Sequence, residues 1–115
     1  KSFRYAFTGI AVLIKSQHNA WIHLFATILV IGCGLFFQID SVEWCLVTLA
    51  ILVVLVSEAF NTAIEFLCNV ASPAPHPLIK KSKDVAAGAV LISAVGAVII
   101  GLIIFLPYLR AQVFS

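Results

Sequence analysis

Three long apolar stretches, separated by short polar segments, dominate the pattern of the chain. They cover residues 20–37, 42–70 and 85–106, and the third stops just before Pro107, which removes a helical hydrogen bond and should end the helix. A bilayer core about 30 Å thick needs roughly 20 helical residues to cross it. The pattern therefore predicts three transmembrane helices over these ranges.

The first residues follow a different pattern. Phe3, Phe7, Ile10 and Ile14 recur with the spacing of one helical face, and the charged side chains lie largely off that face. Such a pattern predicts, over residues 1–17, an amphipathic helix that lies in the membrane interface. A frayed, loosely ordered terminus is the alternative.

Composition supports a membrane location for the whole chain. Of the 115 residues, 63% are hydrophobic and 10% charged, and the mean hydropathy is +1.14. A soluble domain is about 45–50% apolar and about 25% charged, so we expect one all-α integral membrane domain over residues 1–115. Seven Lys and Arg residues and a net charge of +2 argue against a nucleic-acid partner. The three cysteines lie in apolar runs, and we expect buried hydrophobes rather than disulfides or metal ligands. There is no initiator methionine, so we expect the natural chain to begin upstream.

The basic residues predict how the chain is oriented. Six of the seven lie before the first apolar stretch or within the segment 71–84, and only Arg110 follows the third stretch. The link between the first two stretches holds Asp40, with Glu43 just after it, and no basic residue. By the positive-inside rule, the N-terminus and a loop over 71–84 are cytoplasmic and the C-terminus is outside.

The second apolar stretch carries the most informative side chains. Ionisable groups inside a membrane helix are costly and commonly functional. At about 100° per residue, four polar residues fall on one side of this helix and form a polar stripe, namely Glu58, Asn61, Glu65 and Asn69. The structural alternative is that these side chains only hold helices together by hydrogen bonds.

The segment that follows favours a site over this alternative. It brings further charged and titratable residues to the predicted cytoplasmic end of the stripe, namely His76, Lys80, Lys81, Lys83 and Asp84. Mg²⁺ binds one or two carboxylates together with phosphate oxygens, and lysine supplies positive charge to phosphates. The pattern indicates a site for a Mg²⁺-nucleotide, while ordinary membrane anchoring is the alternative for the lysines.

These motifs resemble the prokaryotic diacylglycerol kinase and undecaprenol kinase family of small integral-membrane lipid kinases. The resemblance covers nearly the whole chain and rests on Glu58-Ala-Phe-Asn61-Thr-Ala-Ile-Glu65, on His76-Pro-Leu and on Lys83-Asp84-Val-Ala-Ala-Gly-Ala-Val-Leu. It implies a homotrimer of three-helix subunits, each with an N-terminal surface helix, in the bacterial inner (cytoplasmic) membrane. The implied reaction transfers the γ-phosphoryl group of Mg-ATP to the hydroxyl of a membrane lipid, diacylglycerol or undecaprenol.

The resemblance also implies roles for individual residues. Glu58 resembles the catalytic base, and Glu65 resembles a Mg²⁺ ligand. Gln17 stands where the family usually has a metal-binding glutamate, so it is the second expected metal ligand. The residues expected to contact the nucleotide are Tyr5, Gln17, Asn61, Glu65, His76, Lys83 and Asp84.

Two positions depart from the family pattern. Gln17 and Asn69 place neutral amides where carboxylates are usual, and an amide oxygen can ligate Mg²⁺ without contributing charge. We expect an active enzyme, and a kinase-like subunit that has lost catalysis is the alternative. His76-Pro77-Leu78 and residues 101–107 look closer to the undecaprenol kinase branch than to the diacylglycerol branch.

Two further alternatives concern function class and assembly. A small homo-oligomeric transporter or channel could use Glu58 and Glu65 as an ion site, although it would not need the cluster around Lys83. Small residues line one face of the third stretch and predict close helix packing in a trimer, or alternatively within one subunit. They are Ala86, Ala89, Ser93 and Gly96.

Overall fold

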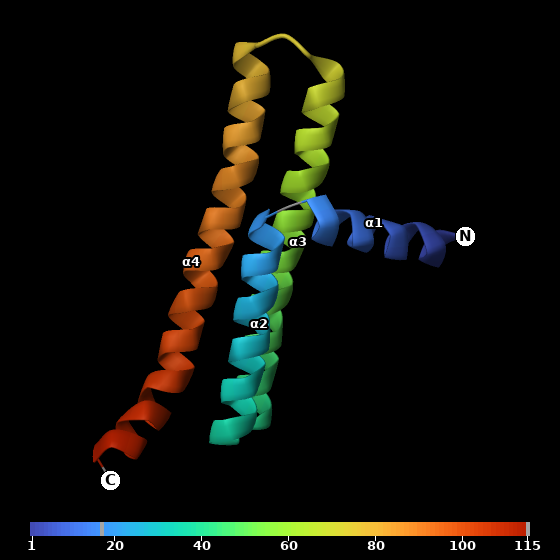
Figure 1. The fold of residues 1–115 in the computed structure, drawn as a ribbon. Coiled ribbons are helices and arrows are strands. Elements are labelled where there is room, and N and C mark those ends of the chain that lie inside the picture. Colours follow the sequence, from blue (N-terminus) through green and yellow to red (C-terminus); the bar gives the residue numbers. More distant parts are fainter. Residues whose placement is uncertain (17, 115) are drawn as a thin grey trace.

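The computed structural model describes the backbone of residues 1–16 and 18–114 and the side chains of residues 1–15 and 21–114. This part of the chain is all-helical, as expected, and its order is α1 (Ser2–Ser16), α2 (His18–Phe37), α3 (Ser41–Ala71) and α4 (Pro77–Phe114). Figure 1 shows α2, α3 and α4 running in alternating directions along one long axis. The predicted loop 71–84 is shorter than expected, because only residues 72–76 separate α3 from α4.

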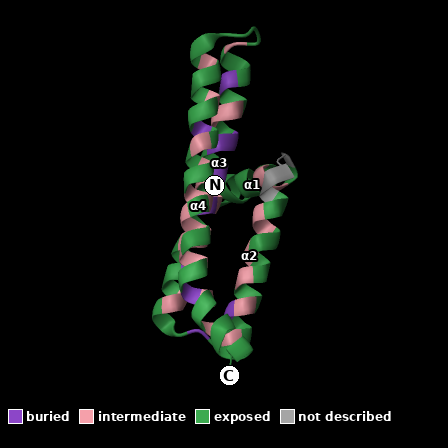
Figure 2. Cartoon of the chain, turned by 90° about the vertical axis from the view of Figure 1, so that its left-hand side faces the viewer, coloured by how far each residue is buried: buried purple, intermediate pink, exposed green. Residues whose placement is uncertain are grey.

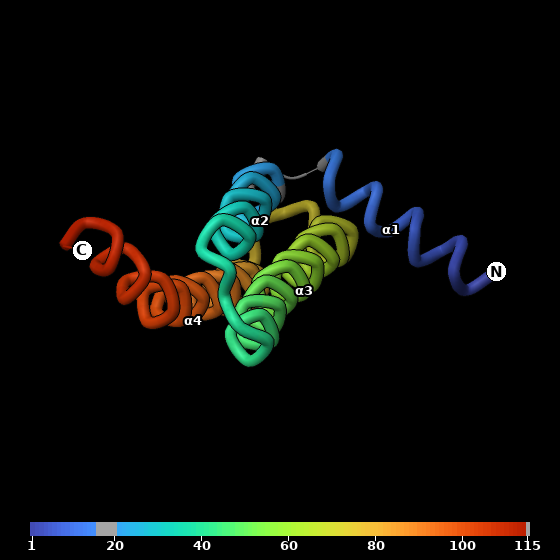
Figure 3. The backbone as a smooth tube through the Cα atoms, turned by 90° about the horizontal axis from the view of Figure 1, so that it is seen from below, coloured from blue at the N-terminus to red at the C-terminus, as the bar shows by residue number. Residues whose placement is uncertain are grey.

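The hairpin of α3 and α4 is the central packing unit of the fold. These two helices pack against each other along their length, and α2 packs against the first part of α3. Helix α1 projects sideways from this bundle, beside the middle of α3 (Figures 1 and 3). The end of the hairpin that carries residues 72–76 therefore extends beyond the level of α1.

The turn between α2 and α3 is determined locally. Gln38 has a left-handed backbone (φ 54°), and the N–H of Ile39 donates to the Gly34 carbonyl at 3.2 Å, which together make a Schellman cap. A Cβ at Gly34 would lie 2.6 Å from the Trp44 ring, so only glycine allows this close approach. Asp40 then caps α3.

Helix α4 corrects the expectation at Pro107. The helix continues through this proline to Phe114, because proline removes one backbone donor and the remaining hydrogen bonds carry the helix on. The last turns lean away from the bundle, as a proline-induced bend predicts (Figure 1). At its other end α4 begins at Pro77, so Lys80, Lys81, Lys83 and Asp84 lie on helical turns rather than in a loop.

Most large apolar side chains are exposed in the single chain (Figure 2). The buried apolar core is small and lies near the turn between α2 and α3, around Ile39, Val47 and Ile104. Within the described residues, α3 and α4 are long and apolar enough to cross a membrane, and α2 carries a shorter apolar stretch over Trp21–Phe37. These features support a membrane protein, while α2 as a third span stays a prediction.

The cysteines occupy three different environments. Cys68 is buried, Cys33 is half-buried and Cys45 is exposed, and all three are free thiols. Burial as small hydrophobes therefore holds for Cys68 and not for Cys45, whose part of α3 faces outward from the single subunit.

Candidate functional site

The polar stripe of α3 passes from buried to exposed as it approaches the end of the hairpin. Glu58 is 1% exposed and Asn61 is 8% exposed, whereas Glu65 is half-buried and Asn69 is exposed. Beyond the stripe, α3 ends at Ala71. The stripe thus connects the interior of the bundle with the surface where the lysines of α4 begin.

Glu58 is the largest fully buried side chain of the described residues. Neither of its carboxylate oxygens has a hydrogen-bond partner among them. The Nε2 atom of His23, on α2, lies 3.2 Å from Oε2 of Glu58, within reach of a hydrogen bond but without the geometry of one. Burying a carboxylate without hydrogen bonds costs free energy. The burial of Glu58 therefore lowers the stability of the fold rather than raising it.

The neighbouring polar side chains are engaged elsewhere. The Thr62 hydroxyl donates to the backbone carbonyl of Glu58 at 3.0 Å, and the Asn61 amide donates to Oε1 of Glu65 at 3.2 Å. The side-chain oxygen of Asn61 is buried and has no hydrogen-bond partner among the described residues. Two side chains of the stripe therefore present unsatisfied oxygens at the same level of α3.

The end of the hairpin collects the cations. The Lys83 ammonium donates to Oδ1 of Asn69 at 2.8 Å, which joins the first turns of α4 to the stripe. Lys80 forms an exposed ion pair with Asp84, 2.7 Å from Nζ to Oδ2, and this carboxylate raises the pKa of Lys80 above its ordinary value. An open hollow of about 900 Å³ lies beside these groups and includes Asn69, His76, Lys80 and Lys83 in its lining.

Of the remaining predicted site residues, His76 borders this hollow, Tyr5 lies apart from it and Gln17 has no described position. His76 acts as the N-cap of α4, because its Nδ1 accepts the backbone N–H of Leu78 at 3.1 Å, although it also lines the hollow. Tyr5 is 72% exposed and lies toward the far end of α1, which projects from the bundle (Figure 3). Gln17 lies outside the described residues.

The oxygen donors in the middle of the stripe, at Asn61 and Glu65, are of the kind that a hard cation prefers. Among the described residues no group of three His, Cys, Asp or Glu side chains could hold a metal ion. Mg²⁺ needs less from a protein, since phosphate oxygens and water complete its shell. Glu65 supplies a carboxylate, and the unsatisfied oxygen of Asn61 is a second hard donor beside it.

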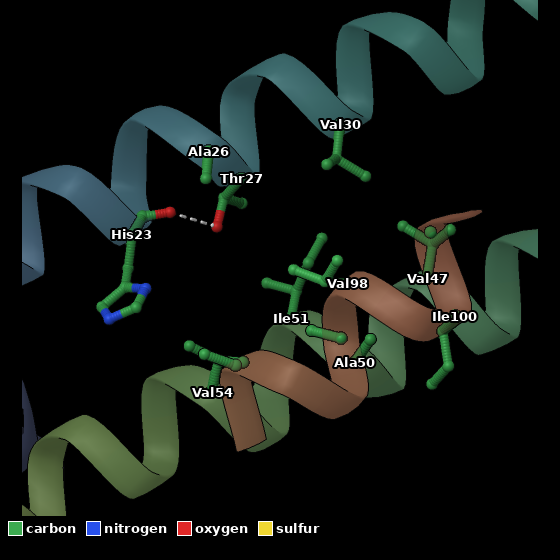
Figure 4. Close-up of a pocket in the computed structure, with 13 residues that line it drawn as sticks. His23, Ala26, Thr27, Val30, Val47, Ala50, Ile51, Val54, Val98 and Ile100 are labelled. Atoms are coloured by element: carbon green, nitrogen blue, oxygen red, sulfur yellow. Dashed lines mark hydrogen bonds between the residues drawn. The ribbon is translucent and has the colours of Figure 1, made fainter. Parts of the chain in front are cut away.

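An apolar cavity of about 330 Å³ lies between α2, α3 and α4, within the bundle (Figure 4). Its walls are almost entirely aliphatic, and His23 is the titratable residue at its edge. Figure 4 shows the His23 ring directed from α2 into the space between α2 and α3. His23 therefore borders the cavity and also contacts Glu58 of the polar stripe.

Sequence reasoning singled out neither His23 nor Tyr108, although each contacts a glutamate of α3. His23 could have been found, because it is the titratable residue of an otherwise uncharged apolar stretch. Tyr108 donates to Oε1 of Glu43 at 2.5 Å across 65 residues of sequence, and no local pattern marks it.

Comparison with known proteins identifies relatives of the chain. The profile of the family described as prokaryotic diacylglycerol kinase matches residues 4–105. The chain is 40% identical over 109 residues to an undecaprenol kinase from Bacillus subtilis, covering 95% of the chain and 89% of that protein. It is 36% identical over 107 residues to a diacylglycerol kinase from Synechocystis, covering 92% of the chain and 61% of that protein.

Proposed function

The chain belongs to the prokaryotic diacylglycerol kinase family and is a lipid kinase, and we propose that it transfers the γ-phosphoryl group of Mg-ATP to the hydroxyl of a membrane lipid. The observation that carries the proposal is Glu58, a buried carboxylate whose oxygens have no hydrogen-bond partner among the described residues. The transporter or channel alternative is not favoured by these relatives.

Glu58 is the general base in this proposal. One of its carboxylate oxygens takes the proton of the lipid hydroxyl, and the hydroxyl oxygen forms a bond to the γ-phosphorus. The bond between that phosphorus and the β–γ bridging oxygen breaks, and its electron pair leaves with ADP. Phosphoryl transfer depends mainly on positioning and charge neutralisation, which suits a site of a few fixed polar groups.

The nucleotide is held, in this proposal, by the stripe from Asn61 toward its exposed end and by the first turns of α4. Glu65 and the Asn61 oxygen would hold Mg²⁺, which supplies charge neutralisation at the phosphates. Lys83 adds positive charge, and it already reaches α3 through Asn69. Asp84, His76 and Tyr5 are the further proposed nucleotide contacts. Gln17 is the proposed second metal ligand on grounds of resemblance alone.

The position of α1 supports a reaction at the membrane surface. Its small and apolar side chains line an open hollow of about 420 Å³ together with Ala59, Thr62, Ala63 and Phe66 of α3, while Phe3 and Phe7 stay exposed. An amphipathic helix of this kind lies at the level of the lipid headgroups. Glu58 would then lie just inside the membrane and Glu65 at its surface. We propose the inner membrane of a bacterium, with the N-terminus and the end of the hairpin cytoplasmic.

The lipid is the part of the proposal that one assay decides. Undecaprenol comes first, because the undecaprenol kinase relative matches the chain over nearly all of both proteins. Purified protein in mixed micelles is given undecaprenol and diacylglycerol side by side, with γ-labelled ATP, and the Glu58→Gln variant is the control. We expect label in lipid phosphate with the parent protein and almost none with the variant. Equal labelling of lipid by the parent protein and by the Glu58→Gln variant would contradict the proposal.

A homotrimer is the proposed assembly. The face of small residues on α4 is divided: Ala86 is buried, and Ser93 lies 2.7 Å from the Ser57 hydroxyl of α3. A Cβ at Gly96 would meet no atom of the described residues within 4 Å. Gly96→Leu should therefore leave the subunit folded and disrupt the trimer, with Gly88→Ala as a smaller change at another open glycine. Cross-linking in detergent that still gives full trimer would contradict this packing.

A further inference from the structure

His23 and Glu58 meet across two helices at the deepest point of the polar stripe. The Nε2 atom of His23 lies 3.2 Å from Oε2 of Glu58, and the imidazole is partly exposed whereas the carboxylate is almost fully buried. A ring nitrogen of His23 that carries a proton can donate the hydrogen bond that a buried carboxylate requires. His23 of this pair also lines the apolar cavity between α2, α3 and α4.

The other polar groups near Glu58 are committed to different partners. Thr62 donates to the Glu58 backbone, and Asn61 donates to Glu65. Ser57, the preceding residue of α3, faces Ser93 of α4 at 2.7 Å. Among the described polar side chains, His23 is therefore the one that contacts the carboxylate itself, and it comes from a different helix.

We propose that His23 is a positioning residue for the catalytic base, holding Oε2 of Glu58 so that Oε1 is directed at the lipid hydroxyl. This inference rests on the role proposed for Glu58. A small rotation of the imidazole would aim its N–H at Oε2, and such bonds commonly tighten only when substrate binds. The carboxylate then keeps one orientation in an otherwise apolar surrounding.

The division of labour between the two oxygens follows from this arrangement. The imidazole of His23 keeps its proton and remains a hydrogen-bond donor to Oε2 during the transfer. Oε1 takes the proton of the lipid hydroxyl as the oxygen–phosphorus bond forms, and the electron pair of the broken β–γ bridge leaves with ADP. Without His23 the carboxylate can turn between several orientations, and a displacement of about 1 Å can cost about 100-fold in rate.

A matched pair of variants tests the donor. His23→Leu keeps the bulk and removes the N–H, whereas His23→Gln keeps a side-chain N–H of similar reach. We expect His23→Leu to lower kcat about 10- to 100-fold with little change in the KM for lipid or ATP, and His23→Gln to recover most of the loss. Phe25→Leu, on the exposed face of α2, is the control and should stay near the parent. If His23→Leu does not fold, His23→Asn, whose amide is too short to reach, replaces it.

A second background shows whether His23 acts through Glu58. Glu58→Asp withdraws the carboxylate from His23, so adding His23→Leu to it should cost less than about threefold in kcat. An equal cost in both backgrounds would overturn the inference, because His23 would then act independently of Glu58. Parent-like kcat in His23→Leu would also overturn it, while loss of activity in Glu58→Gln alone would leave the proposed function standing. Parent-like activity in Glu58→Gln would instead refute the proposed function.

Discussion

Glu43 and Glu58 are the same residue type on the same helix, yet their carboxylates have opposite surroundings. Oε1 of Glu43 accepts the backbone N–H of Asp40 at 3.0 Å and the hydroxyl of Tyr108 at 2.5 Å. Both oxygens of Glu58 lack a hydrogen-bond partner among the described residues. Hydrogen bonds to a carboxylate are typical of a structural role, and a buried carboxylate without them is typical of a functional site, which is the role proposed for Glu58.

How closely the helices pack also changes along α3 between the two carboxylates. Near Glu43, the turn between α2 and α3 is closed by a Schellman cap, a capping box and the buried side chains of Ile39, Val47 and Ile104. Between the levels of Glu43 and Glu58, an apolar cavity is lined by residues of α3 from Val47 to Val54 and by residues of α2 and α4. The turn end of the bundle is therefore closely packed, whereas the part of the bundle between the two glutamates retains unfilled space.

The largest expected effect comes from exchanging the two glutamates for glutamine separately. Glu58→Gln should lower kcat about 10²- to 10⁴-fold, because general-base catalysis is worth about that much, and should leave the helices intact. Glu43→Gln should keep activity within about threefold of the parent, since no reacting group is removed. The measurements are lipid kinase rates and circular dichroism in the same detergent. Comparable losses of kcat in Glu58→Gln and Glu43→Gln would contradict the proposed difference between the two glutamates.

An intermediate effect is expected at Glu65, where the stripe reaches the surface. Glu65→Gln should raise the Mg²⁺ concentration for half-maximal rate about tenfold or more, because the amide retains an oxygen and loses the charge. Gln17→Glu should act in the opposite direction if residue 17 belongs to the metal shell. Both are read from Mg²⁺ titrations at fixed ATP.

The Mg²⁺ titrations of the two variants test Glu65 and Gln17 separately as metal ligands. A shifted curve for Glu65→Gln together with an unmoved curve for Gln17→Glu would place Gln17 outside the metal shell. An unmoved curve for Glu65→Gln would remove Glu65 from it.

The smallest effect is expected at the cap of α3. Asp40→Ala removes the acceptor of the Glu43 N–H, which lies at 2.8 Å, and should lower the free energy of unfolding by about 1 kcal/mol without changing kcat. Asp40→Asn keeps a capping oxygen and should lose less. Unfolding in denaturing detergent, followed by circular dichroism, measures the difference. A fall in kcat with unchanged stability would mean that this end also takes part in the reaction.

The sequence alone determined the helices, the membrane character and the polar stripe. These depend on local properties, namely the length of apolar runs and the spacing of Glu58, Asn61, Glu65 and Asn69 on one helix. The family motif added which stripe residue is the candidate base, because the E-x-x-N-x-x-x-E spacing is itself local. The end of α4 was missed, since a proline at position 107 forbids one hydrogen bond and does not determine whether the helix resumes.

Only the tertiary structure decided which polar groups are satisfied. His23 reaches Glu58 from α2, Tyr108 reaches Glu43 from the far end of α4, and Lys83 reaches Asn69 across the hairpin. Each contact depends on the separation and rotation of two packed helices, which no pattern within one helix specifies. Whether a buried glutamate is structural or available for chemistry is therefore a property of the packing, although its position is written in the sequence.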